Sequence, residues 1–190
     1  MRNENVLSMI LSGLGTDILV VILSAILPLL VGIGLTVLMH FTRKSPLPKV
    51  LRYVAILTEG LVPTAVLFIT FFSVPDVVQE MIPTFRGQAI SCAVISLSIC
   101  FLGYMVFRYE ERDSLLKNIV VNGIGLIADL FKWCVALVAI IGVQDLIGFA
   151  KVYVGRTFEY VIPYTLVLIV SSVVLVVLYL ARQLCKDLMK

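Results

Sequence analysis

Residues 161–180 read VIPYTLVLIVSSVVLVVLYL, a run without a charged side chain. A helix needs roughly 20 apolar residues to cross the hydrocarbon core of a bilayer, which is about 30 Å thick. The whole chain of 190 residues shares this character, because 61% of its residues are hydrophobic and its mean hydropathy is +1.09. Charged residues make up 14%, whereas soluble domains carry about 25%. The composition therefore predicts an all-α, polytopic membrane protein.

Five segments are long and apolar enough to span the membrane, and no soluble domain or internal repeat separates them. We therefore expect a single transmembrane domain over residues 1–190. Its five transmembrane helices are predicted at residues 18–41, 51–73, 89–107, 119–143 and 161–180. Residues 144–160, between the last two spans, are long enough for an amphipathic helix lying on the membrane surface.

The basic residues set the expected orientation of these spans. Most of the 15 Lys and Arg residues lie in the first connection, in the third connection and in the C-terminal tail. Cytoplasmic segments of membrane proteins are enriched in Lys and Arg. All three basic segments fall on one side of the membrane when the number of spans is odd. We therefore expect the N-terminus outside and the C-terminus in the cytoplasm.

Three ionisable residues lie well inside the predicted spans: Glu59, Asp129 and Lys132. A charged side chain at the bilayer centre costs about 2.5–3.5 kcal/mol on insertion scales, so these groups should face the bundle interior or a wet cavity. Asp129 and Lys132 are three residues apart on one helix and are able to pair. We expect an interhelical contact between Glu59 and Lys132, with Asp129 nearby. Such a contact either fixes the helix register or lines a path for a polar solute, unless the span boundaries lie elsewhere.

Gly60 and Pro63 interrupt the second span. Proline removes a backbone donor and bends a helix, so this pair predicts a kink that serves either packing or gating. Nothing in the sequence suggests an enzyme: there is 1 His, no nucleophile–base–acid set, no metal-ligand spacing and no phosphate-binding loop. We therefore expect no catalytic residue, metal or cofactor. The net charge of +3 is too small to indicate a nucleic-acid partner.

Short motifs over most of the chain resemble those of one transporter family. GLGT at residues 13–16 precedes the first span, and RKS at residues 43–45 follows it. FFSVP at residues 71–75 closes the second span, and IGVQDL at residues 141–146 is followed by RTF at residues 156–158. With these motifs the sequence resembles the permease subunits of polar-amino-acid importers, which are type I ABC transporters.

The resemblance implies a bundle of five transmembrane helices in a bacterial plasma (inner) membrane. It also implies a non-catalytic permease subunit for amino acids or similar small polar solutes. The partners it implies are the lipid bilayer, a second permease subunit, cytoplasmic ATP-binding subunits that hydrolyse ATP, and an extracytoplasmic solute-binding protein.

Three stretches depart from the family's pattern. Residues 58–61 read TEGL where family members carry RGTP, and residues 133–137 read WCVAL where they carry KDTSL. Residues 108–118 join the third and fourth spans without the family's EAA loop, whose short helix docks on the ATPase. We therefore expect a degenerate permease, the atypical half of a heterodimer whose partner keeps that loop. The alternatives are a non-transporting scaffold or regulatory membrane subunit, and a passive channel.

Overall fold

A computed structural model describes residues 2–43, 45–81 and 89–189, and the regular structure in these ranges is helical throughout. The elements are α1 (Arg2–Phe41), α2 (Leu47–Glu59), α3 (Pro63–Met81), α4 (Ala89–Cys100), α5 (Tyr104–Phe107), α6 (Leu115–Leu137), the 3-10 turn η1 (Val138–Ile141), α7 (Leu146–Thr157) and α8 (Val161–Leu188). The predicted all-α class is confirmed.

Among the described residues, four helices are long and apolar enough to cross a membrane, and a bent pair makes a fifth candidate. They are Val6–Phe41, Ala89–Phe107, Leu115–Ile141, Val161–Leu188 and the pair of Leu47–Glu59 with Pro63–Ser73. Each overlaps one of the expected spans. The first and last helices are longer than expected, because α1 runs unbroken from Arg2 and α8 continues into the basic tail. The orientation relative to the two sides of a membrane stays a prediction.

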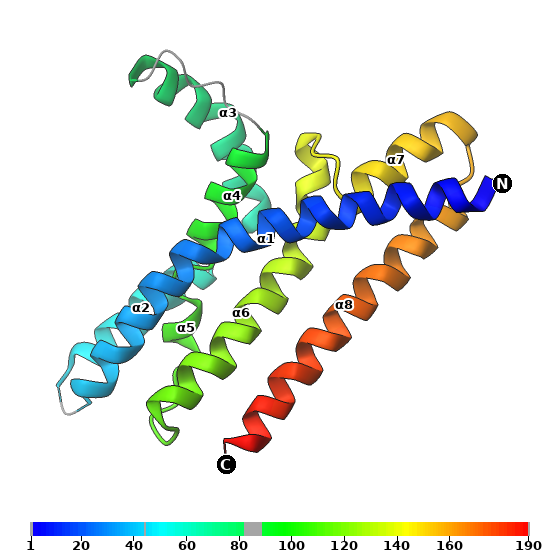
Figure 1. Cartoon of the computed structure of the whole chain (residues 1–190). Coiled ribbons are helices and arrows are strands. Elements are labelled where there is room, and N and C mark those ends of the chain that lie inside the picture. The colour runs from blue at the N-terminus through cyan, green and yellow to red at the C-terminus, as the bar shows by residue number, and fades with distance from the viewer. Residues whose placement is uncertain (1, 44, 82–88, 190) are drawn as a thin grey trace.

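The two chain termini lie at opposite ends of the bundle (Figure 1). The N-terminus lies beside α7, whereas the C-terminus lies at the end that carries the α1–α2 and α5–α6 connections. Two hydrogen bonds join these connections: Arg43 Nε donates to Tyr109 Oη over 3.2 Å, and Arg43 Nη2 donates to the carbonyl of Asp113 over 3.4 Å. The three basic segments of the sequence therefore gather at one end, as an odd number of spans requires.

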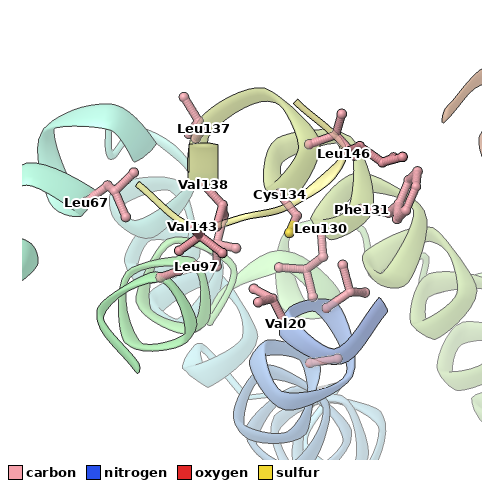
Figure 2. Packing of buried hydrophobic residues seen from close by; sticks show 14 of the residues in the cluster. Val20, Leu67, Leu97, Leu130, Phe131, Cys134, Leu137, Val138, Val143 and Leu146 are labelled. Atoms are coloured by element: carbon pink, nitrogen blue, oxygen red, sulfur yellow. The ribbon is translucent and has the colours of Figure 1, made fainter. Parts of the chain in front are cut away.

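The apolar core lies where α1, α4, α6 and α7 meet (Figure 2). Val20 of α1 lies beside Leu130 of α6, and Leu97 of α4 lies beside Val143. Val20, Leu130 and Leu146 are fully buried. In a water-soluble protein, burial of each such side chain stabilises the fold by about 1.5–3 kcal/mol. Between membrane helices, close van der Waals packing provides the stabilisation instead.

Two buried carboxylates fix α7 against α1 and α6. Asp17 of α1 accepts hydrogen bonds from the backbone N–H of Leu146 over 3.1 Å and from Cys134 Sγ over 3.2 Å. Asp145 is the N-cap of α7, where its Oδ1 accepts from the N–H of Gly148 over 2.6 Å. Both residues are fully buried, and Oδ2 of Asp145 has no hydrogen-bond partner among the described residues.

Gly13 allows α1 to approach this junction closely. A Cβ at Gly13 would lie 2.6 Å from the carbonyl oxygen of Asp145 and 2.8 Å from the backbone N of Leu146. Because both atoms belong to the backbone, no side-chain rotation would relieve the overlap. At Gly15, on the same helix, an added Cβ would have nothing within 4 Å.

Gly13→Ala is therefore expected to destabilise the protein by about 1–3 kcal/mol, the usual range for overpacking. Gly15→Ala is the matched control and should be neutral or stabilising by roughly 0.5–1 kcal/mol, because alanine is the better helix former. Thermal unfolding in detergent micelles measures both variants. Equal melting temperatures for the two would contradict the close contact between α1 and α7.

Asp145 makes the stability of the α7 junction depend on pH. Burial raises the pKa of this carboxyl from 3.8 to about 6, against the lowering effect of the Gly148 hydrogen bond. The pKa of Asp145 is therefore higher in the folded protein than in the unfolded protein. The protonated carboxyl contributes its full stability below pH 4, and this contribution is lost as the pH rises through 6.

Asp145→Asn keeps the N-cap acceptor without the charge. The free energy of unfolding of this variant should exceed that of the wild type by about 1–3 kcal/mol at pH 7.5 and should equal it at pH 4. The difference between the two proteins reports on the charge of Asp145, including its interaction with the nearby carboxylate of Asp17. Chemical unfolding at the two pH values is the measurement, and a stability difference that does not change with pH would rule out the burial effect.

Candidate functional site: a charged cavity at the break between α2 and α3

The second span is broken between Glu59 and Pro63, where the axes of α2 and α3 differ by 73°. Gly60 ends α2, and its N–H donates back to the carbonyl of Ile56 over 2.9 Å. Pro63 is the first residue of α3, a position where its missing N–H leaves no helical hydrogen bond unmade. The structure therefore bends the chain at Gly60 and Pro63. A gating role for this bend stays a prediction.

A cavity of about 540 Å³ adjoins the break. It lies between the α2–α3 linker, the α4–α5 turn and the middle of α6. Its lining consists of Glu59, Leu61, Val62, Pro63, Cys100, Phe101, Tyr104, Arg108, Asp129, Lys132 and Trp133. All three ionisable residues that the sequence placed inside the spans thus line one cavity.

Arg108 is the centre of the charged network in this cavity. Its Nη1 lies 2.8 Å from Oε1 of Glu59, and its Nη2 lies 3.5 Å from Oδ2 of Asp129. The side chains of Arg108, Glu59 and Asp129 are 33%, 29% and 22% exposed, so the network is partly open to solvent. One guanidinium therefore bridges two carboxylates that come from different helices.

Two tyrosines complete the network around Asp129. Tyr104 Oη donates to Oδ2 over 2.8 Å, and Tyr179 Oη of α8 donates to Oδ1 over 3.0 Å. The guanidinium carbon of Arg108 lies 4.0 Å from the centre of the Tyr104 ring, within reach of a cation–π interaction. The carboxylate of Asp129 is thus bound by side chains of α5 and α8 as well as by Arg108.

The backbone around Gly103 brings α2 and α5 together. A Cβ at Gly103 would overlap Thr58 Oγ1 and lie 2.8 Å from the Cα of Ala55, so only a glycine fits between the two helices. The amide of Asn122 in α6 donates to the carbonyl of Arg108 over 3.2 Å. These contacts place the end of α2, which carries Glu59, beside the guanidinium.

The expected contact between Glu59 and Lys132 is wrong, since Glu59 pairs with Arg108 instead. Lys132 is exposed and makes no ion pair within 4.0 Å with any described residue, so it does not pair with Asp129 either. Arg108 was missed because it follows the third apolar run and was counted with the connection. Its long side chain reaches Glu59 and Asp129 on neighbouring helices.

Tyr104 and Tyr179 are also functional candidates that sequence reasoning missed. Tyrosines at helix ends are typical of the membrane interface, and no sequence signal connects these two with Asp129. Within the three described ranges, no three His, Cys, Asp or Glu side chains gather as a metal site would require.

The overall fold is similar to that of a known transporter. A chain from a structure described as "Crystal structure of an amino acid ABC transporter with histidines" superposes with a TM-score of 0.73. The superposition covers 95% of this chain and 94% of that chain, at 18% sequence identity. No family model matches the sequence, and no curated protein is significantly similar to it. The likeness shows a shared fold over nearly the whole length of both chains.

A double-mutant cycle separates the two possible partners of Glu59. The pair of Glu59→Gln and Arg108→Gln should show a coupling energy of about 1 kcal/mol, since these part-exposed groups contact each other directly. The matched cycle of Glu59→Gln with Lys132→Met should show coupling near zero. Thermal unfolding in detergent gives both values. A larger coupling for the Lys132 cycle than for the Arg108 cycle would refute the observed pairing.

Proposed function

We propose that this chain is a membrane-spanning permease subunit of an ABC importer for amino acids or similar small polar solutes. The observation that carries the proposal is the 540 Å³ cavity, whose wall presents both signs of charge. The shared fold with a chain of an amino acid ABC transporter supports it. A permease of this kind is a non-catalytic subunit, and ATP hydrolysis belongs to a separate partner.

The chemistry of the cavity suits a zwitterion. The ammonium of Lys132 is free of ion pairs with described residues and is exposed, so it is available to a solute carboxylate. The carboxylates of Glu59 and Asp129 are available to an α-ammonium group once Arg108 turns towards the incoming carboxylate. A zwitterionic solute separates Arg108 from Glu59 and Asp129, but its own carboxylate and ammonium then pair with these groups. No group is therefore left buried without a counter-charge.

We further propose that the chain is the atypical half of a heteromeric importer. Residues 108–114 connect α5 to α6 and contain turns without a helix. Asn118 holds this connection against α6, because its Nδ2 donates to the carbonyl of Glu110 over 2.8 Å while its Oδ1 accepts from the N–H of Glu110 over 2.9 Å. A connection this short offers little of the roughly 800 Å² per partner that a stable interface buries.

The complete importer then requires other subunits to couple transport to ATP. A second permease subunit supplies the coupling helix and engages the cytoplasmic ATP-binding subunits. An extracytoplasmic solute-binding protein delivers the solute. In this arrangement the present chain contributes a wall of the path and the bend at Gly60 and Pro63, whereas its partner transmits the movement.

A second candidate is a non-transporting scaffold or regulatory membrane subunit. Arg108 already pairs with both Glu59 and Asp129, and Tyr104 and Tyr179 donate to the two oxygens of Asp129. A network this complete is also what a purely structural junction requires. The two candidates differ in the part they assign to Lys132, which the network does not use.

Solute uptake by the complete complex tests the proposal. The tagged chain should co-purify with a second permease subunit and an ATP-binding subunit. The reconstituted complex should take up at least one standard amino acid when ATP is supplied. Lys132→Met should lower that uptake by up to about fivefold, because an exposed solute ion pair is worth up to about 1 kcal/mol, and should leave the melting temperature unchanged.

Lys49→Met is the matched control, since Lys49 is exposed and lies outside the cavity. Its uptake should equal that of the wild type. A stable monomer or symmetric homodimer without permease or ATPase partners would overturn the importer assignment. Partners without any amino acid uptake, or uptake that does not change in Lys132→Met, would favour the scaffold.

A further inference from the structure

A second, larger cavity of about 640 Å³ lies at the end of the bundle that carries the C-terminus. It lies between the beginning of α6, the end of α8 and the α5–α6 connection. Five cations line it (Arg52, Arg108, Lys117, Arg182 and Lys186), whereas Glu110 and Asp113 are its acidic side chains. The excess of positive charge distinguishes this cavity from the one beside Pro63.

Three of these cations are already engaged within the protein. Arg108 pairs with Glu59 and Asp129, and Lys117 Nζ lies 2.9 Å from Oδ1 of Asp113. Arg52 Nη2 donates to the carbonyl of Tyr109 over 3.0 Å. Their positions are thus explained by the fold.

Arg182 and Lys186 are different, because neither forms an ion pair within the described part of the chain. They lie one turn apart on α8. Arg182 extends over α6, where a Cβ at Gly125 would lie 3.1 Å from its guanidinium carbon. The guanidinium therefore lies over α6, and no carboxylate of the described residues is within 4.0 Å of it. Such a group is well suited to a phosphate, because guanidinium binds phosphate oxygens through two parallel hydrogen bonds.

The exposed surface of α8 before these two cations is apolar. On the preceding turns of α8, Val173, Val176, Val177 and Leu180 are all more than half exposed. Across its length α8 buries Pro163 and Val167 and leaves most other side chains exposed or half-buried. An exposed helix surface of this kind meets lipid chains when it lies in a bilayer. Arg182 and Lys186 then lie beyond the apolar stretch, at the depth of the headgroups.

We propose that this cavity binds the phosphate-bearing headgroup of an anionic phospholipid, whose acyl chains lie along α8. Arg182 and Lys186 bind the headgroup, and Gln183 of the cavity wall supplies a further amide donor. A basic pocket between transmembrane helices is the usual setting for such a lipid. The proposal does not depend on the transport assignment, because lipid binding needs neither a solute nor ATP.

Titration of the purified protein in detergent with dioleoyl phosphatidylglycerol, followed by native mass spectrometry, tests this site. Wild-type protein should bind phosphatidylglycerol more tightly than phosphatidylcholine and should melt at a higher temperature in its presence. Each cation near an anionic surface contributes about fivefold in affinity. Arg182→Gln/Lys186→Gln should therefore weaken phosphatidylglycerol binding by roughly tenfold or more and leave phosphatidylcholine binding unchanged.

Lys49→Gln/Arg112→Gln is the matched control, because it removes two exposed cations near the same end of the bundle but outside the cavity. It should bind phosphatidylglycerol as the wild type does. If Arg182→Gln/Lys186→Gln does not fold, Lys186→Gln alone should weaken binding by about fivefold. Arg182→Lys keeps the charge but loses the two parallel hydrogen bonds, so it should weaken binding less than Arg182→Gln does.

Three outcomes would overturn the lipid assignment. Equal phosphatidylglycerol affinity in the cavity variant and in the control variant is the first. Stabilisation by inorganic phosphate or glycerol phosphate at millimolar concentration, equal to that by the lipid, would show that the cavity takes a soluble anion. Loss of a co-purifying protein subunit from the cavity variant, with lipid binding intact, would show that the cavity is a protein-docking surface.

Discussion

The exclusion of uncompensated charge from a low-dielectric interior is the constraint on which this bundle depends. Arg108 meets that constraint by bridging Glu59 of α2 and Asp129 of α6, while Tyr104 and Tyr179 bind Asp129 from α5 and α8. Four helices therefore converge on one carboxylate and one guanidinium. Removal of Arg108 leaves two partly buried carboxylates without a counter-charge, so the positions of α2 and α6 depend on the guanidinium between them.

Much of the fold is readable from the sequence, because apolar runs of about 20 residues have few alternatives in a membrane. The last helix begins at Val161, where the hydrophobic pattern places its start, and α6 with η1 ends at Ile141, close to the predicted end at residue 143. Part of the lining of the cavity beside Pro63 is predictable from the sequence. Glu59, Asp129 and Lys132 stand out as charges in apolar runs, and the structure brings all three to one lining.

The partner of Glu59 was not predictable, since spacing along one helix says nothing about a side chain that reaches across from another. Arg108 lies outside every apolar run, and its length alone lets it enter the bundle. The junction of Asp17 with Asp145 was missed for a similar reason. Each residue lies next to a predicted span boundary, where an acidic side chain is ordinary, and their proximity results from the packing of α7 on α1.

The length of α1 has a consequence for the membrane itself. At 40 residues this helix is about 60 Å long, roughly twice the thickness of the hydrocarbon core. Such hydrophobic mismatch is accommodated by tilt, and a thicker bilayer favours a more upright helix. Because Gly13 and Asp17 attach α7 to one end of α1 and Arg43 attaches the α5–α6 connection near the other, a change in tilt moves both attachments together. A bilayer that changed the tilt of α1 would therefore displace both connections at once.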